Sequence, residues 1–165
     1  RDLIDEVGRD ATRYFLVARA PNSQLIFDID LALSQSNDNP VYYIQYAYAR
    51  TCSVLRKLVE QGWEWQVEDA VQNLDQLREE HEKSLLRRLD RYPEVIATAA
   101  LNNEPHTVAT YLRELAGDFH TWYNAHKMLV DDRALRNARI ALSQAVGQVI
   151  YNGLGLLGVS APEVM

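Results

Sequence analysis

The sequence has one cysteine, Cys52, and few turn-forming residues, with 7 glycines and 5 prolines in 165 positions. A single cysteine excludes an intramolecular disulfide, and an unpaired thiol is more typical of the reducing cytosol than of a secreted protein. No run of about 20 consecutive apolar residues is present, and the opening RDLIDEVGRD is too acidic for a signal peptide. We therefore expect a soluble, cytoplasmic chain that does not cross a membrane.

Positive charge is also scarce. The 17 lysines and arginines are outnumbered by 23 aspartates and glutamates, which gives a formal net charge of −6. Unspecific binding to DNA or RNA needs clustered cations that neutralise phosphates. We therefore expect no DNA partner, and any contact with RNA must be local.

Recognisable catalytic and metal-binding motifs are missing as well. The sequence has no GxxxxGK[ST] phosphate loop, no GxGxxG after a strand and no GxSxG nucleophile elbow. The four histidines lack the HExxH arrangement and cysteine partners, and we interpret each as a surface or rim residue: His81, His106, His120 and His126. The carboxylates of REEHEKSLLRRLDR are interpreted as a solvated helix face. We predict no catalytic residue, no cofactor and no metal site in this chain.

What is present is helical patterning. Breaks are short and widely spaced, which predicts an all-α fold. Helices are expected over 9–19, 28–36, 40–61, 78–91, 93–102, 106–128 and 132–157. Asp131 and Asp132 favour a helix start, and the glycines at 153, 155 and 158 are expected to mark the end of the last helix. Residues 61–77, which include Trp63 and Trp65, are interpreted as a loop with weak helical character.

Three of these helices carry apolar faces that should pack together as a helical bundle. In the first face the spacing of three and four residues unites Val41, Ile44, Tyr48, Thr51, Leu55 and Leu58. The second face contains Val108, Leu112, Leu115, Phe119 and Trp122. The third is a seven-residue repeat of Leu135, Leu142, Val149 and Leu156, interleaved with Ala138 and Ala145.

The segment NPVYYIQYAYARTCSVLRK has a second face. At about 100° per residue, a stripe forms more than 90° from the apolar face, and its members are Tyr43, Tyr46, Arg50, Ser53 and Lys57. Aromatic rings followed by cations suit an unpaired nucleic-acid strand, because rings stack on bases and cations meet phosphates. The alternative is that the tyrosines bury their rings at the rim of the bundle and expose their hydroxyls. The pattern alone favours this packing alternative.

Two further positions are ambiguous for the same reason. Trp122 belongs to an apolar face, so the neighbouring Tyr123 should point about a quarter turn away, towards the surface. Met165 is the last residue, and a terminal methionine usually frays in solvent. Pattern alone assigns neither residue a role.

Three segments nevertheless resemble one known family. The opening DLIDEVGRDATRYFLVAR resembles the helix that follows the KMSK-type loop in bacterial-type arginyl-tRNA synthetases. The segment FDIDLALSQSNDNPVYYIQYAYAR is similar to that family's FDxDLA…NPVYYVQYAHAR signature. The end, DDRALRNARIALSQAVGQVIYNGLGLLGVSAPEVM, resembles its LxxARLxLxxAxxQVLxNGLxLLGVxAPERM close. The resemblance spans essentially the whole chain.

This resemblance implies an all-α, DALR-type anticodon-binding domain of a class I synthetase that joins arginine to its tRNA using ATP and magnesium. Residues 1–37 would connect from the catalytic domain, and residues 38–165 would form the anticodon-binding bundle. The start at Arg1 instead of methionine agrees with such a longer parent protein, which we expect to be monomeric. The HIGH-type and KMSK-type motifs that bind ATP are absent, so this chain alone should not activate arginine. Anticodon-loop contacts are implied for Tyr43, Tyr46 and Arg50, and a pocket near the central anticodon base is implied for Tyr123 and Met165.

Two departures from the family pattern stand out. Tyr48 occupies the position of the histidine in QYAHAR, and since it lies on the apolar face we expect altered packing. Val164 replaces the arginine of the terminal ERM, which removes a cation beside the implied pocket. Two other interpretations remain open, a helical protein-interaction module centred on Trp63 and Trp65, and a DALR-type domain of another class I synthetase such as the cysteine enzyme.

Overall fold

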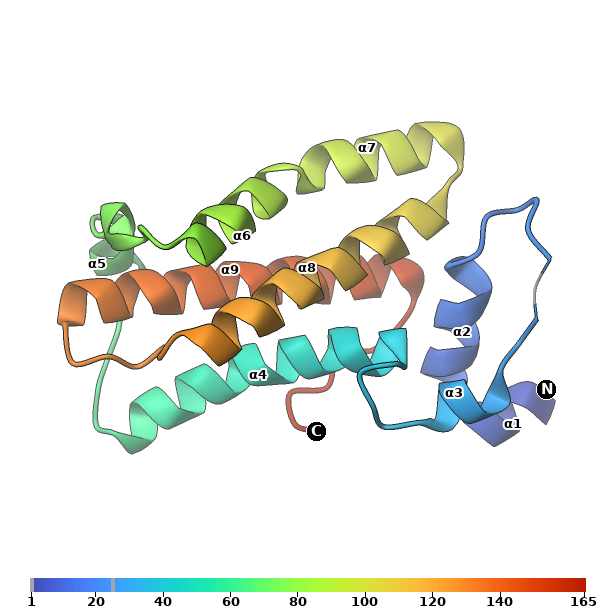
Figure 1. Cartoon of the computed structure of the whole chain (residues 1–165), viewed down its shortest axis with the longest axis horizontal. Helices are drawn as coiled ribbons and strands as arrows, with labels where there is room; N and C mark the ends of the chain where they lie inside the picture. Colours follow the sequence, from blue (N-terminus) through green and yellow to red (C-terminus); the bar gives the residue numbers. More distant parts are fainter. Residues whose placement is uncertain (1, 25) are drawn as a thin grey trace.

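A computed structural model describes residues 2–24 and 26–165, and every regular element in these ranges is helical (Figure 1). The elements are α1 (Asp2–Val7), α2 (Arg9–Val17), α3 (Ile29–Leu33), α4 (Pro40–Glu60), α5 (Val67–Val71), the 3-10 helix η1 (Leu74–Gln76), α6 (Glu80–Asp90), α7 (Tyr92–Asn102), α8 (Pro105–Ala125) and α9 (Arg133–Leu157). The predicted all-α fold is confirmed.

The bundle is built on three long helices that contact one another, α4, α8 and α9 (Figure 1). Helices α6 and α7 follow one another along α8, and α5 lies against α9. The short helices α1, α2 and α3 gather at one end of the bundle, where α2 contacts α4, α8 and α9. The core therefore lies where α8 and α9 meet their neighbours.

The starts of α4 and α9 follow from capping side chains. Asn39 Oδ1 accepts hydrogen bonds from the backbone N–H groups of Val41 and Tyr42, which satisfies two donors at the start of α4. Asp132 caps α9 by accepting from the Leu135 N–H at 3.2 Å. The predicted acidic start of the last helix is therefore confirmed, and the predicted start of α4 at residue 40 is also found.

The apolar face predicted for α8 is confirmed in full, since each of its five members is at most 5 % exposed. The face predicted for α4 is confirmed in part. Tyr48 and Leu55 are half-buried, while Ala47 and Val54 occupy the interior in addition to the predicted residues. Tyr48 packs against Tyr151, with 5.9 Å between ring centroids, so it lies at the edge of the core.

The seven-residue repeat predicted for α9 is confirmed only in part, because its last member leaves the core. Leu156 is 61 % exposed, whereas Leu142 is 2 % exposed. A straight helix drifts by about 20° for every seven residues, so a strict repeat rotates by about 60° over three intervals and leaves the core. The buried positions instead follow spacings of four, four and three residues, at Val146, Ile150, Leu154 and Leu157.

The glycines of α9 also differ from the prediction. The helix continues through residues 153 and 155 and ends at Leu157, with Gly158 in the left-handed conformation at φ 71°. A Cβ atom at Gly153 would lie 2.6 Å from Cδ2 of Leu112. Gly153 therefore allows α8 and α9 to approach closely, and only Gly158 marks the end of the helix.

A buried ion pair joins α6 to α9. Glu82 is fully buried and accepts from Arg139 Nε at 2.7 Å and from Trp122 Nε1 at 3.3 Å. Arg139 also donates to the Lys127 carbonyl at 2.8 Å. We call Glu82, Trp122 and Arg139 the Glu82 cluster. The interpretation of this stretch as a solvated face is wrong for Glu82, because its carboxylate is neutralised inside the bundle.

Two segments contain more structure than predicted. Helix α1 lies outside the predicted helices, and the segment 61–77 contains α5 and η1. The guanidinium of Arg136 lies 3.9 Å from the centroid of the Trp63 ring. By length and composition α9 could also cross a membrane. Half of its most apolar 18-residue window is buried inside the bundle, so we assign this apolar character to the core.

Candidate functional site

Aromatic and polar side chains from α4 and α8 surround one arginine. The Cζ atom of Arg50 lies 4.5 Å from the ring centroid of Tyr46 and 4.6 Å from that of Tyr123. Both distances fall within the range of cation–π attraction. Helix geometry brings these groups together, because Tyr46 and Arg50 are one turn apart on α4 and Tyr123 lies near the end of α8.

Hydrogen bonds fix the same arginine. Its Nη1 lies 2.9 Å from His120 Nδ1 and donates to Asn124 Oδ1 at 3.2 Å. The other ring nitrogen, His120 Nε2, lies 3.0 Å from the Tyr43 carbonyl oxygen. Because a carbonyl can only accept, Nε2 carries the proton and Nδ1 accepts from the arginine. We call this group the Arg50 cluster: Tyr43, Tyr46, Arg50, His120, Tyr123 and Asn124.

His120 was not predicted to be part of a site. Its side chain is 5 % exposed, so the interpretation of all four histidines as surface or rim residues is wrong for this one. Burial lowers the pKa of His120 below its ordinary value of 6.5, and the charge of Arg50 lowers it further, while the hydrogen bond to Tyr43 acts in the opposite direction. A signal was available in the sequence, since Leu112, Ala116 and His120 follow one another at four-residue spacing on one side of the predicted helix.

The charge of Arg50 is not neutralised by a carboxylate. In the described part of the chain, Arg88, Arg133 and Arg139 each form an ion pair with an acidic side chain, whereas no acidic side chain pairs with Arg50. A guanidinium between two ring faces can still bind an anion or a base edge through its N–H groups, while the rings can stack on a base. The Arg50 cluster is therefore suited chemically to phosphate oxygens and unstacked bases.

The remaining members of the predicted stripe face the same way. Tyr43, Tyr46, Arg50 and Ser53 are half-buried and Lys57 is exposed. The structure thus brings four of the five predicted site residues into one cluster, namely Tyr43, Tyr46, Arg50 and Tyr123. Because these tyrosines and the arginine are each half-buried, the packing and binding interpretations of the tyrosines do not exclude each other.

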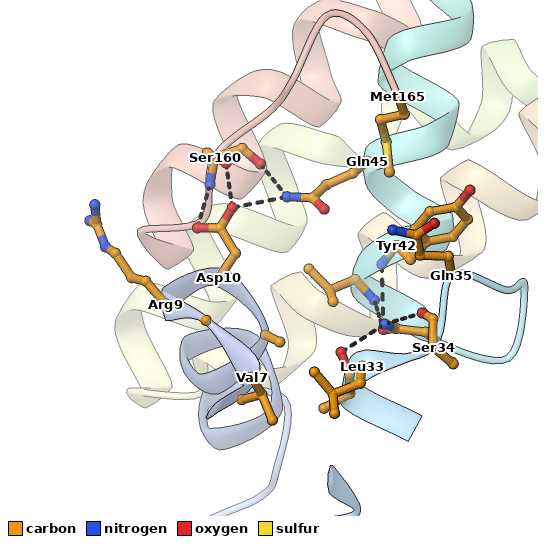
Figure 2. A pocket seen from close by; sticks show the side chains of 15 residues that line it. Val7, Arg9, Asp10, Leu33, Ser34, Gln35, Tyr42, Gln45, Ser160 and Met165 are labelled. Carbon is orange, nitrogen blue, oxygen red and sulfur yellow. Dashed lines mark hydrogen bonds between the residues drawn. The ribbon is translucent and has the colours of Figure 1, made fainter. Parts of the chain in front are cut away.

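Met165 lies elsewhere, in a cavity of about 700 Å³. The cavity lies between the start of α2, the turn after α3, the first turns of α4 and the C-terminal tail, and Tyr123 does not line it (Figure 2). Met165 is 48 % exposed at this place. The resemblance implied that Met165 and Tyr123 form one pocket. In the structure they lie in two different places.

Tyr42 was not among the predicted site residues, yet it lies between the cavity and the Arg50 cluster. Its ring lines the cavity and stacks on Tyr46, with 6.1 Å between the centroids and 21° between the planes. Tyr42 and Tyr46 are one helical turn apart, which is the signal that could have identified the pair. A continuous aromatic row thus leads from the cavity to the Arg50 cluster.

The C-terminal tail is held by side chains from distant parts of the chain. Figure 2 shows Asp10, Gln45 and Ser160 pointing toward one another. Gln45 Nε2 donates to Asp10 Oδ2 at 3.0 Å and to the Ser160 carbonyl at 2.9 Å. The Ser160 backbone N–H donates to Asp10 Oδ1 at 3.2 Å. These bonds determine where the tail lies, and Val164 near its end is 71 % exposed and does not line the cavity.

Comparisons with known proteins identify the family of this fold. The family model described as the DALR anticodon binding domain matches residues 44–165. The arginine–tRNA ligases of Thioalkalivibrio sulfidiphilus and Legionella pneumophila are 58 % and 55 % identical over all 165 residues. This chain spans 28 % of the length of each of these relatives.

Solved structures give the same result. The chain is similar to the arginyl-tRNA synthetase of Thermus thermophilus, with a TM-score of 0.80 and 34 % identity, and the match covers 97 % of this chain and 27 % of that one. The Plasmodium falciparum arginyl-tRNA synthetase also matches with a TM-score of 0.80, at 25 % identity, over 99 % of this chain and 28 % of that one.

Proposed function

Since this chain belongs to the DALR anticodon binding domain family, we propose that it recognises the anticodon loop of an arginine tRNA. The observation that carries the proposal is the position of Arg50 between the rings of Tyr46 and Tyr123, with no carboxylate to neutralise it. Bases unstacked from the loop would stack on the tyrosines, and the arginine would bind a phosphate or a base edge. Tyr43 would support the same surface.

Met165 has a separate part in this proposal. Its side chain would provide an apolar wall in the neighbouring cavity, where Tyr42 offers a ring face. A base placed there would be in reach of the aromatic row that leads to Tyr46. The overall charge of −6 agrees with such local recognition, because specificity would come from pocket shape and hydrogen bonds more than from phosphate contacts.

We propose further that the parent protein is a cytoplasmic, monomeric arginine–tRNA ligase. The support is that relatives named arginine–tRNA ligase match over the whole of this chain, which favours arginine over cysteine as the amino acid. ATP and magnesium would then bind outside these residues. In the parent, residues 1–37 would connect to the catalytic domain and residues 38–165 would form the anticodon-binding bundle.

The protein-interaction alternative has less support in the structure. It was based on the negative surface and on the loop that contains Trp63 and Trp65. Both rings are half-buried against the core, and Arg136 covers one face of Trp63. An apolar docking surface needs a contiguous exposed patch, and these two side chains do not offer one.

The test is binding of an arginine-tRNA anticodon stem-loop to Tyr46→Leu and Tyr123→Leu. Loss of one stacking ring should weaken binding by about 1–3 kcal/mol, or roughly five- to hundredfold, and should reduce discrimination against a changed central anticodon base. Tyr151→Leu is the matched control, because Tyr151 is an exposed tyrosine of α9 outside both places. If both variants bind like the control, with the same base preference, the proposal is wrong.

A further inference from the structure

Arg50 owes its position to a buried histidine. Of the two side chains that accept its hydrogen bonds, Asn124 is exposed, whereas His120 is 5 % exposed. An exposed amide moves freely and competes with water for its partners. The buried ring is therefore the acceptor that can define where the guanidinium lies between the two tyrosines.

The histidine ring is itself held from several sides. Its Nε2 donates to the Tyr43 carbonyl at 3.0 Å. Its centroid lies 4.5 Å from the Tyr43 ring, 5.5 Å from the Tyr46 ring and 6.1 Å from the Phe119 ring. With the plane and the tautomer both fixed, the Nδ1 lone pair can point only towards Arg50.

We propose that His120 is a positioning residue for RNA recognition, whose neutral imidazole holds Arg50 between Tyr46 and Tyr123 and releases it when the ring is protonated. The RNA part of this inference rests on the proposed function. The positioning part concerns the chain alone and can be tested without RNA.

A neutral acceptor suits this task better than a carboxylate would. A carboxylate in place of His120 would bind the guanidinium more strongly, but it would also cancel the charge that a phosphate has to meet. The Glu82 cluster shows that outcome, because Arg139 is neutralised there by an acidic partner. The imidazole of His120 fixes the cation and leaves its charge available.

Protonation would reverse the arrangement. A proton on Nδ1 would replace the lone pair by an N–H group and place a second positive charge at the 2.9 Å contact with Arg50. The titratable and charged groups that contact the ring are Tyr43, Tyr46 and Arg50 from α4, and Tyr123 of α8 flanks Arg50. Among the described residues no carboxylate pairs with His120, so nothing near the ring offsets the added charge.

Two substitutions separate the two hydrogen bonds of the ring. In His120→Asn the amide oxygen can replace Nδ1 as the acceptor for Arg50, while the donor to Tyr43 is lost. In His120→Gln the amide nitrogen can replace Nε2 as the donor to Tyr43, and the acceptor beside Arg50 is lost. The first substitution should preserve the position of the arginine, and the second should not.

The first readout needs no RNA. The guanidinium signals of Arg50 in a nuclear magnetic resonance spectrum should be displaced by the two flanking rings. We expect that displacement to persist in His120→Asn and to disappear in His120→Gln. If both variants keep it, or both lose it to the same degree, His120 does not position Arg50 through Nδ1 and the inference is overturned. Thermal unfolding of each variant verifies that the spectra are those of folded chain.

The second readout is binding of the anticodon stem-loop. We expect His120→Gln to bind about tenfold more weakly than the parent, and His120→Asn to stay within about threefold. Adding Arg50→Gln to His120→Gln should cause no further loss, because both act on one contact. If the double variant instead loses affinity by the product of the two single losses, the inference is contradicted. If Arg50→Gln alone leaves RNA binding unchanged while the resonance result holds, the proposed function fails and the positioning role of His120 stands.

A pH profile completes the test. Affinity of the parent chain should fall as the pH is lowered beneath the ordinary histidine value of 6.5. His120→Asn has no titrating ring at this position and should lack that component of the profile. Equal profiles for the two proteins would show that protonation of His120 does not release Arg50.

Discussion

Two consecutive residues of α8 serve two arginines in different ways. Trp122 points into the bundle, where its Nε1 donates to the carboxylate that pairs with Arg139. Tyr123 points outwards and covers Arg50. Both arginines are held firmly, but the partners differ, since one meets an acid in the interior and the other meets ring faces and neutral acceptors at the surface.

The difference lies in what happens to the positive charge. In the Glu82 cluster the charge is compensated and removed from water, so that arginine can stabilise the fold but cannot meet a ligand. In the Arg50 cluster the guanidinium stays partly solvated, which makes an uncompensated charge tolerable. The partner, more than the residue type, thus decides whether an arginine is structural or able to bind RNA.

The largest loss of stability is expected when the ion pair of the Glu82 cluster is removed. Glu82→Gln would leave Arg139 buried without its counter-ion, and the free energy of unfolding should fall by about 3–5 kcal/mol. Urea unfolding measures this. The matched control is Glu80→Gln on the exposed side of the same helix, which should unfold like the parent because Glu80 pairs with Lys83 in solvent. Equal stability of the two variants would refute the structural role of the ion pair.

A smaller loss of stability is expected at the contact between α4, which carries Arg50, and α9, which carries Arg139. A Cβ atom at Gly147 of α9 would lie 2.5 Å from Oγ1 of Thr51, the residue after Arg50 on α4. Gly147→Ala should therefore lower the free energy of unfolding by about 1–3 kcal/mol. Gly155→Ala is the control, since no atom lies within 4 Å of a Cβ there, and it should stabilise the helix slightly. Thermal unfolding should show a lower midpoint for Gly147→Ala than for Gly155→Ala, and the reverse order would contradict the close approach of the helices.

The Arg50 cluster should contribute least to stability. Arg50→Gln removes two cation–π contacts at the surface and the hydrogen bond to His120, and about 1 kcal/mol should be lost from the free energy of unfolding. The same substitution in the interior, Arg139→Gln, strands the Glu82 carboxylate and should cost several times more. Chemical unfolding of the pair gives the comparison directly. Similar losses in both would mean that the two clusters do not differ in the way described.

Acid should reveal a still smaller contribution from His120. Its pKa is lowered in the folded chain, so the unfolded chain takes up the proton first as the pH falls below 6.5. Stability is then complete above that value and declines between it and the lower folded pKa. Urea unfolding at about pH 7.5 and about pH 5.5 should show a larger decline for the parent than for His120→Asn. A larger decline for His120→Asn than for the parent would contradict the lowered pKa of His120.

Local patterns predicted most of this fold because helix periodicity and capping depend on neighbours in sequence. The apolar face of α8 and the start of α4 behind Asn39 are both determined within a few residues. The stripe of Tyr43, Tyr46 and Arg50 was found for the same reason, although the pattern alone favoured packing and only the family resemblance favoured RNA binding.

Features that depend on distant residues were missed. Glu82 looks like part of a charged surface until Arg139, 57 residues later, is placed beside it. His120 gains its partners from α4, 70 and 77 residues earlier. The strict repeat in α9 fails at Leu156 for a geometric reason, because a helix with 3.6 residues per turn rotates positions seven apart slowly away from the core. The cavity beside Met165 could not be foreseen, since it is built from the two ends of the chain and α4.

The contact of Asp10, Gln45 and Ser160 has a consequence for the order of folding. It joins positions 150 residues apart, and such a long loop is costly to close before the helices between its ends have formed. The bonds involved are largely exposed, and each contributes only about 1 kcal/mol. The tail should therefore dock last and detach first. Met165 can then leave the cavity and return to it while the bundle that carries Arg50 stays folded.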